Sequence, residues 1–232
     1  MLMIFLLGLF SPMMAGVQSS WTAAEPFQRW SLDKAVEVLN NSPWAKQKTF
    51  THVIRGVGSG ISGEKEIYNT FYVRFLSARP IREAYIRVQQ IRYGYDSMLL
   101  KEKRRFESEQ SHKLDLDVSK WIVISVGFRS NDPNEESSVR RFFQSHTSMT
   151  MKTKAFLSTP ACSQVEIAAY FPPMEESVGA KFVFPREYQG RPVVTKECSI
   201  VSFELLDIPE ANSRFRTTFD VGSMIVGGRV II

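Results

Sequence analysis

Residues 121–128 have the sequence WIVISVGF, which is nearly all apolar and rich in β-branched side chains. A run of this length and composition, followed by the turn signal Asp132-Pro133-Asn134, predicts a β-strand. Because it lacks the polar alternation of a strand that faces water on one side, both of its faces should be buried. The segment therefore predicts a strand inside a sheet that other elements cover.

Two strands and a long helix are expected before this strand. Residues 49–54 alternate loosely between polar and apolar side chains, and residues 68–76 are rich in aromatic and β-branched ones. The glycine-rich run 56–63 separates them, so the simplest interpretation is an antiparallel pair joined by a long loop. Residues 80–107 then carry a helical repeat that opens with a proline and has Gly94 as its weak point.

A shorter helix is expected over residues 32–39, where apolar side chains recur at helical spacing. Ser31 is of a type that caps helix N-termini, and Asp33 lies in the first turn, where the helix dipole favours an acid. Pro43 should end the helix, because a proline disfavours helical geometry at the residue before it.

Strands dominate the second half of the chain. After a short helix with Val139, Phe142 and Phe143, only strand patterns bounded by Pro or Gly follow. The expected strands are residues 149–157, 164–171, 181–184, 198–206 and 216–221. Gly227-Gly228 lies between two apolar runs at residues 224–231, which is typical of a β-hairpin.

These patterns predict an α+β fold, with a β-rich, mostly antiparallel sheet and two or three helices packed on it. The change of character near Thr147 would also suit a boundary between a mixed half and an all-β half. We expect a single domain over residues 25–232, in which the late strands complete a sheet that the earlier helices cover.

The first 24 residues contain no Asp, Glu, Lys or Arg, and residues 4–10 are almost continuously apolar. This run is shorter than the ~20 residues of a membrane-spanning helix, but it suits the hydrophobic part of a signal peptide. We therefore expect residues 1–24 to be a signal peptide cleaved between residues 15 and 24. The mature chain would then be exported, periplasmic or extracellular, with no transmembrane span. The alternative is that this segment forms an apolar first strand or helix.

Cys162 and Cys198 are the two cysteines of the chain. In an oxidising compartment an even pair suggests one disulfide. The other interpretation is that both are buried free thiols, because free Cys packs as a small apolar side chain.

Composition places the chain among ordinary globular proteins, with 44% hydrophobic and 23% charged residues. The net charge of +5 is weak for a chain of 232 residues and does not imply nucleic-acid binding. The densest basic cluster is Lys101, Lys103, Arg104 and Arg105, which could serve an anionic surface. Acidic residues are interleaved with this cluster, so the alternative is that it forms an ordinary solvated helix end.

Several short segments match known functional motifs but lack the neighbouring elements that the corresponding chemistry needs. Residues 58–63 match G-x-G-x-x-G, but dinucleotide binding requires a helix directly afterwards, whereas a strand pattern follows. Ser31 and Ser62 each begin an S-x-x-K tetrapeptide without the S-D-N and K-T-G elements of penicillin-binding enzymes. The acidic pairs 135–136 and 175–176 resemble surface loops, since adjacent residues point in different directions.

No metal, cofactor or catalytic residue is predicted. The histidines, His52, His112 and His146, do not stand at the spacing of metal ligands. His112 with Asp115 and Asp117 could form a small oxygen-rich site, but a polar connection explains these residues equally well.

Two segments resemble motifs of a family of uncharacterised exported bacterial proteins, in which a short helix precedes SPWAxQ and SARPIREA opens a longer one. Here they are residues 41–47 and 73–84. The resemblance implies export and a shared fold, and it transfers no activity. The motif residues, whose role is unknown, are Pro43, Trp44, Arg79, Pro80, Arg82 and Glu83.

Physical chemistry gives two of these residues a provisional role. Trp44 buries a large area and is expected to be a core or interface anchor rather than a ligand platform. Arg79 either donates hydrogen bonds to the turn before its helix or faces an acidic partner.

The leading hypothesis is an exported, non-enzymatic binding or structural module of the cell envelope, with another envelope protein or an anionic surface as its partner. The alternative is an exported hydrolase-like enzyme whose site residues are scattered through the fold. A cavity that gathers Arg79, Glu83, His112 and Asp115 would favour the enzyme.

Overall fold

The fold is built on two antiparallel sheets, in a computed structural model that describes residues 25–56, 63–174, 179–211 and 213–232. The larger sheet has the order β1-β2-β3-β7-β6, and the smaller has the order β11-β10-β4-β5. Their strands are β1 Ala45–Arg55, β2 Glu64–Phe75, β3 Trp121–Ser130, β4 Ala155–Ser158, β5 Val165–Glu166, β6 Ala169–Phe171, β7 Ala180–Pro185, β10 Ile200–Leu206 and β11 Arg214–Asp220. Two small hairpins pair β8 Glu187–Tyr188 with β9 Arg191–Pro192, and β12 Ile225–Val226 with β13 Arg229–Val230.

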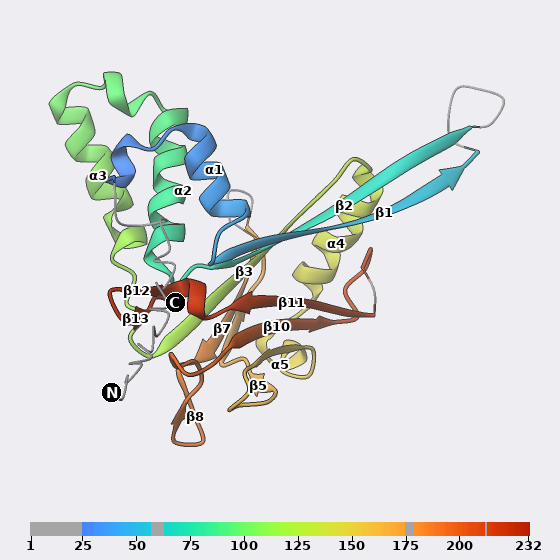
Figure 1. The fold of residues 1–232 in the computed structure, drawn as a ribbon. Helices are drawn as coiled ribbons and strands as arrows, with labels where there is room; N and C mark the ends of the chain where they lie inside the picture. The colour runs from blue at the N-terminus through green and yellow to red at the C-terminus, as the bar shows by residue number, and fades with distance from the viewer. Residues whose placement is uncertain (1–24, 57–62, 175–178, 212) are drawn as a thin grey trace, which may run out of the picture.

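The α-helices are α1 Leu32–Asn40, α2 Arg79–Arg92, α3 Leu100–Leu114, α4 Pro133–Ser145 and α5 Ser148–Met151. Helices α1, α2 and α3 lie together near one end of the larger sheet, and the β1–β2 hairpin extends from the body on the other side (Figure 1). Helix α4 lies against β3. The expected α+β fold, β-rich and antiparallel, is confirmed.

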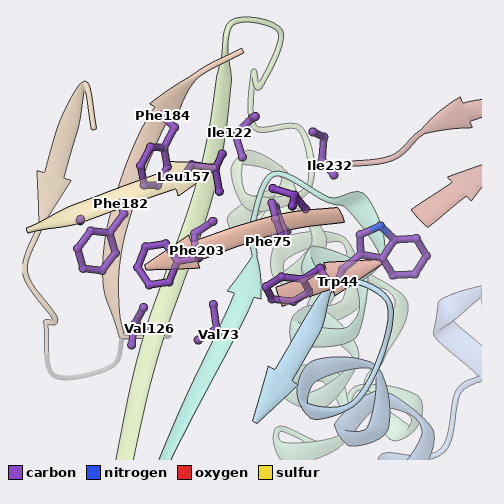
Figure 2. Packing of buried hydrophobic residues seen from close by; sticks show 14 of the residues in the cluster. Trp44, Val73, Phe75, Ile122, Val126, Leu157, Phe182, Phe184, Phe203 and Ile232 are labelled. Atoms are coloured by element: carbon purple, nitrogen blue, oxygen red, sulfur yellow. The ribbon is translucent and has the colours of Figure 1, made fainter. Parts of the chain in front are cut away.

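The core lies between the two sheets. Alternation along β2 buries Phe71, Val73 and Phe75 on the face that packs against the smaller sheet. Figure 2 shows Phe182 of β7 beside Phe203 of β10, with their ring centroids 5.3 Å apart. Residues 122–126 of β3 are all buried, as expected for a strand covered on both faces.

Local signals set the helix and hairpin boundaries. The Ser31 hydroxyl accepts a hydrogen bond from the Lys34 N–H at 3.1 Å and so caps α1. Asp132 caps α4 in the same manner through the Asn134 N–H. Gly227 and Gly228 both have positive φ in the β12–β13 turn, which confirms the predicted hairpin.

The prediction of a single helix over residues 80–107 is wrong, because two helices, α2 and α3, occupy this region. Gly94 has a φ of +68°, a left-handed conformation that glycine adopts at little cost, and it ends α2. The chain turns through a 3-10 segment, Tyr95–Ser97, before α3 begins. Arg87 of α2 is buried and donates from Nη1 and Nη2 to the Asp96 carboxylate at 3.0 Å.

Two strand predictions were also wrong in part. Residues 149–151 of the expected strand 149–157 belong to helix α5, because Thr147 caps a short turn through the Thr150 N–H. The expected strand 164–171 is two short strands in different sheets, β5 and β6. Gln164 has a positive φ just before β5, which the alternation of apolar residues could not indicate.

The two cysteines are free thiols in the structure, which agrees with the second of the two interpretations. Cys162 and Cys198 are both buried. The Cys162 Sγ lies 3.9 Å from the Pro192 carbonyl oxygen, and the Cys198 Sγ lies 3.7 Å from the Thr195 hydroxyl. The expected signal peptide, residues 1–24, lies outside the described residues.

Candidate functional site

An open cavity of about 590 Å³ lies between strands β2 and β3 and helix α4. Its polar lining comes mainly from these three elements, with Asn40 at the end of α1. The residues that carry the argument are Tyr72, Arg74, Arg129, Glu136, Arg140 and Gln144. Three arginines against one glutamate give the lining a positive charge, so we call it the arginine cavity.

Arg74 reaches the cavity because of the alternation of β2. Its neighbours Val73 and Phe75 point into the core, so Arg74 and Tyr72 lie on the other face of the strand. The Arg74 Nε donates to the Leu39 carbonyl oxygen at 2.5 Å, and its Nη2 donates to the Asn40 Oδ1 at 2.8 Å. These acceptors belong to the last turn of α1, where the helix dipole is negative.

The charge of Arg74 is only partly compensated. Among the described residues no carboxylate forms an ion pair with it, and its guanidinium carbon lies 5.0 Å from the centre of the Tyr72 ring. Burial disfavours the charged form and lowers the pKa of Arg74 to about 10. Arg74 is half-buried, and a charge withdrawn from water without a carboxylate partner is favourable to the binding of an anion.

Helix α4 supplies the opposite wall. Glu136, Arg140 and Gln144 recur every four residues and therefore lie along one face of the helix. The Glu136 carboxylate is engaged by Arg129 of β3 at 2.8 Å. Arg140 is exposed and makes no ion pair with another residue that the structure describes. Two guanidinium groups, those of Arg74 and Arg140, thus remain without a carboxylate at the same cavity.

A close backbone approach fixes the border of the cavity at β7. Gly179 has a φ of +110°, and a Cβ placed there would lie 2.2 Å from the Val126 carbonyl oxygen. Only glycine can therefore occupy this position without moving β3.

The chemistry of the lining suits binding more than bond cleavage. Guanidinium groups match carboxylate and phosphate oxygens in shape and charge. None of the described residues that line the cavity is Ser, Cys or His, and the one carboxylate is held by Arg129. The described lining thus offers cationic hydrogen-bond donors, and it lacks a nucleophile with a general base beside it.

The motif residues lie elsewhere, where they support the fold. Trp44 is fully buried and Pro43 is buried beside it, so the expected core role of Trp44 is the one found. Pro80 occupies the first turn of α2. Arg79 is exposed and donates to Glu83 at 2.8 Å, within its own helix.

Arg82, rather than Arg79, holds the turn before α2. Its Nη1 donates to the carbonyl oxygens of Leu76 at 2.9 Å and Ser77 at 2.6 Å, and its Nε donates to that of Leu114 at 3.1 Å. Burial is the main cause that lowers the pKa of Arg82. These hydrogen bonds join the start of α2 to the end of α3. Arg82, one of the motif residues, therefore has a structural role.

The other polar candidates do not converge on one site. His112, Asp115 and Asp117 are exposed, and none of them lines the arginine cavity. Over the described ranges, no group of three or more His, Cys, Asp or Glu side chains could hold a metal ion. Residues 58–62 of the G-x-G-x-x-G match lie outside the described residues. Strand β2 begins at Glu64, directly after Gly63, so a strand stands where dinucleotide binding needs a helix.

Comparisons with models of protein families, with curated proteins and with solved structures find no match for this chain. Within the part of the chain that the structure describes, no helix combines the length and apolar character needed to cross a membrane.

Sequence reasoning did not single out Arg74 and Arg140. One signal was present: Arg74 is a charged residue inside the otherwise apolar run Tyr72 to Leu76, where an unpaired charge has a cost. Arg140 carried no comparable signal, because a charged residue on an exposed helix face is ordinary.

Proposed function

We propose that this protein is an exported, non-enzymatic binding module of the cell envelope whose arginine cavity binds an anionic group of its ligand. The observation that carries the proposal is that Arg74 and Arg140 border one open cavity while neither is paired with a carboxylate. The charge-free, apolar residues 1–24 support the export part of the proposal.

The ligand group is expected to be a carboxylate or a phosphate. Arg74 is held in place by Leu39 and Asn40, so its remaining N–H groups are oriented before the ligand arrives. Such preorganisation reduces the entropy lost on binding. The Tyr72 ring lies 5.0 Å from the guanidinium carbon of Arg74, and both residues line the cavity.

Titration of the isotope-labelled protein with inorganic phosphate and with citrate, followed by NMR, tests the proposal. We expect saturable shifts in the Nε–Hε signals of Arg74 and Arg140. Arg140→Gln should weaken binding at least about tenfold, the size expected when one charge-assisted contact is lost. Comparison of the affinities for the two anions shows whether the cavity prefers phosphate or carboxylate groups.

Arg191→Gln is the matched control, because it removes the same charge from an exposed position at the start of β9. The proposal fails if neither anion produces saturable shifts, or if Arg191→Gln weakens binding as much as Arg140→Gln. Substrate turnover in a broad hydrolase panel, abolished by one polar substitution at the cavity, would replace the binding module with the alternative enzyme.

N-terminal sequencing of native protein tests the export part separately. We expect the native chain to begin between residues 16 and 25. Recovery of Met1 on protein from the cytoplasm would contradict export and leave the binding test unaffected.

A further inference from the structure

The connection between α2 and α3, residues 93–100, exposes large apolar side chains. Leu99 and Leu100 are 73% and 66% exposed, and Tyr93 is 54% exposed. In Figure 1 this connection lies at the far end of the helical group, away from both sheets. We call residues 93–100 the α2–α3 tip. Large apolar side chains that lie exposed next to one another indicate a surface that contacts a partner or a membrane.

Local contacts hold the tip in shape. The Glu102 carboxylate accepts a hydrogen bond from the Leu99 N–H at 2.9 Å, which fixes the start of α3. The Tyr95 ring packs on Phe106, with centroids 5.4 Å apart, and Asp96 pairs with the buried Arg87. Tyr95 and Phe106 therefore fill the space inside the tip, and the two leucines are left on its outside.

Basic residues surround the exposed leucines. Residues 92–105 contain five Lys or Arg and two acids. Both acids are already engaged, Asp96 by Arg87 and Glu102 by the Leu99 N–H. Lys101 and Arg104 are exposed and make no ion pair with another described residue. The neighbourhood of the leucines is thus positively charged.

We propose that the α2–α3 tip docks on an anionic lipid bilayer, with Leu99 and Leu100 inserted and the basic side chains on the headgroups. Apolar side chains next to Lys and Arg are the combination that binds the interface of anionic membranes. Tyr93 suits the headgroup level, where aromatic rings with a polar end are enriched. Two tips of like charge would repel, so the charge favours a membrane over a second copy as the occupant.

An environment-sensitive fluorophore at the tip reports insertion directly. NBD is attached to Leu99→Cys in the full chain, in which Cys162 and Cys198 are buried and poorly accessible. Vesicles of equal parts phosphatidylglycerol and phosphatidylcholine should shift its emission to the blue. Vesicles of phosphatidylcholine alone should require at least about tenfold more lipid for the same change.

The matched control carries the fluorophore at Met149→Cys. Met149 is more exposed than Leu99, at 81%, and lies on α5. Its emission should stay that of an aqueous probe in the same samples, even where other parts of the chain contact lipid. In the Leu99→Cys protein, Lys101→Glu with Arg104→Glu should abolish the blue shift at moderate salt, because these charges supply the attraction.

Two outcomes overturn the proposal. The first is an aqueous emission at position 99 in the presence of the anionic vesicles. The second is a blue shift without vesicles that grows with protein concentration, which would assign the tip to a second copy. Circular dichroism of each variant checks that it is folded. Arg140→Gln should leave the shift unchanged, so this test is independent of the arginine cavity.

Discussion

The indole Nε1 of Trp44 donates a hydrogen bond to the carbonyl oxygen of Ile231 at 2.5 Å, which joins two residues 187 positions apart. Ile231 in turn donates its N–H to the Met224 carbonyl oxygen, and Arg186 contacts the carbonyl oxygen of Ile232. Residues 231 and 232 are therefore tied to the residue before β1 and to the residue after β7. Figure 2 shows Trp44 and Ile232 among the buried residues of the core.

Trp44→Phe should lower the free energy of unfolding by about 1–3 kcal/mol, because it removes the donor from the part-buried carbonyl oxygen of Ile231. Trp121→Phe serves as the control: Trp121 is 39% exposed, and its replacement should change stability by less than about 0.5 kcal/mol. Urea denaturation of both variants measures the difference. Equal effects would show that the contact with Ile231 contributes nothing measurable.

Arg82→Lys should destabilise the protein by about 1–3 kcal/mol. A lysine has one ammonium group, which cannot reach the carbonyl oxygens of Leu76, Ser77 and Leu114 as the planar guanidinium does. Arg79→Lys is the matched control, since Arg79 is exposed and pairs only within its helix, where about 0.5 kcal/mol is expected. The proposed role of Arg82 is wrong if thermal denaturation ranks the two variants equally.

Much of the fold could be predicted because local patterns agree with the final packing. The run at residues 121–128 is a fully buried strand, and Ser31 caps the helix that the spacing of apolar residues indicates. The errors at Gly94 and Thr147 arose where one residue changes the backbone direction inside an apolar pattern. Periodicity alone does not distinguish a continuous element from two shorter ones.

The arginine cavity could not be predicted, because it depends on which strands meet α4. Residue 74 lies 66 positions before Arg140 in the sequence, and the fold alone brings both to one cavity. Pairing decides the role of each arginine: Arg129 is neutralised by Glu136, and Arg140, only eleven positions further along the chain, is not. Such pairing is tertiary information.

Gly179→Ala should destabilise the protein by about 3 kcal/mol or more, because the added Cβ would lie 2.2 Å from the backbone of Val126 at a positive φ. Gly190→Ala is the control, with a φ of +74° and nothing within 4 Å of the added atom. It carries the conformational cost alone, about 1 kcal/mol. Guanidinium denaturation compares them, and similar midpoints would rule out the close approach at the cavity border.

Glu210→Gln should stabilise the protein near neutral pH. Partial burial, the neighbouring Glu135 and also Asp132 raise the pKa of Glu210, while a hydrogen bond from Ser138 and the charge of His52 act against them. Because the folded pKa lies above the unfolded one, folding binds a proton between the two values. The free energy of unfolding therefore falls as the pH rises through that window.

Glutamine keeps a hydrogen-bonding group next to Ser138 and removes the charge. The gain at pH 7 should be less than about 1 kcal/mol, since solvent screens a carboxylate that is only half buried. This gain should disappear below about pH 4, where Glu210 is protonated in the folded and in the unfolded protein. Glu187→Gln, on an exposed strand end, is the control and should show no such gain. Urea denaturation at both pH values tests the sign: a variant less stable than the parent at pH 7 would mean that the Glu210 carboxylate is favourably paired in the folded protein.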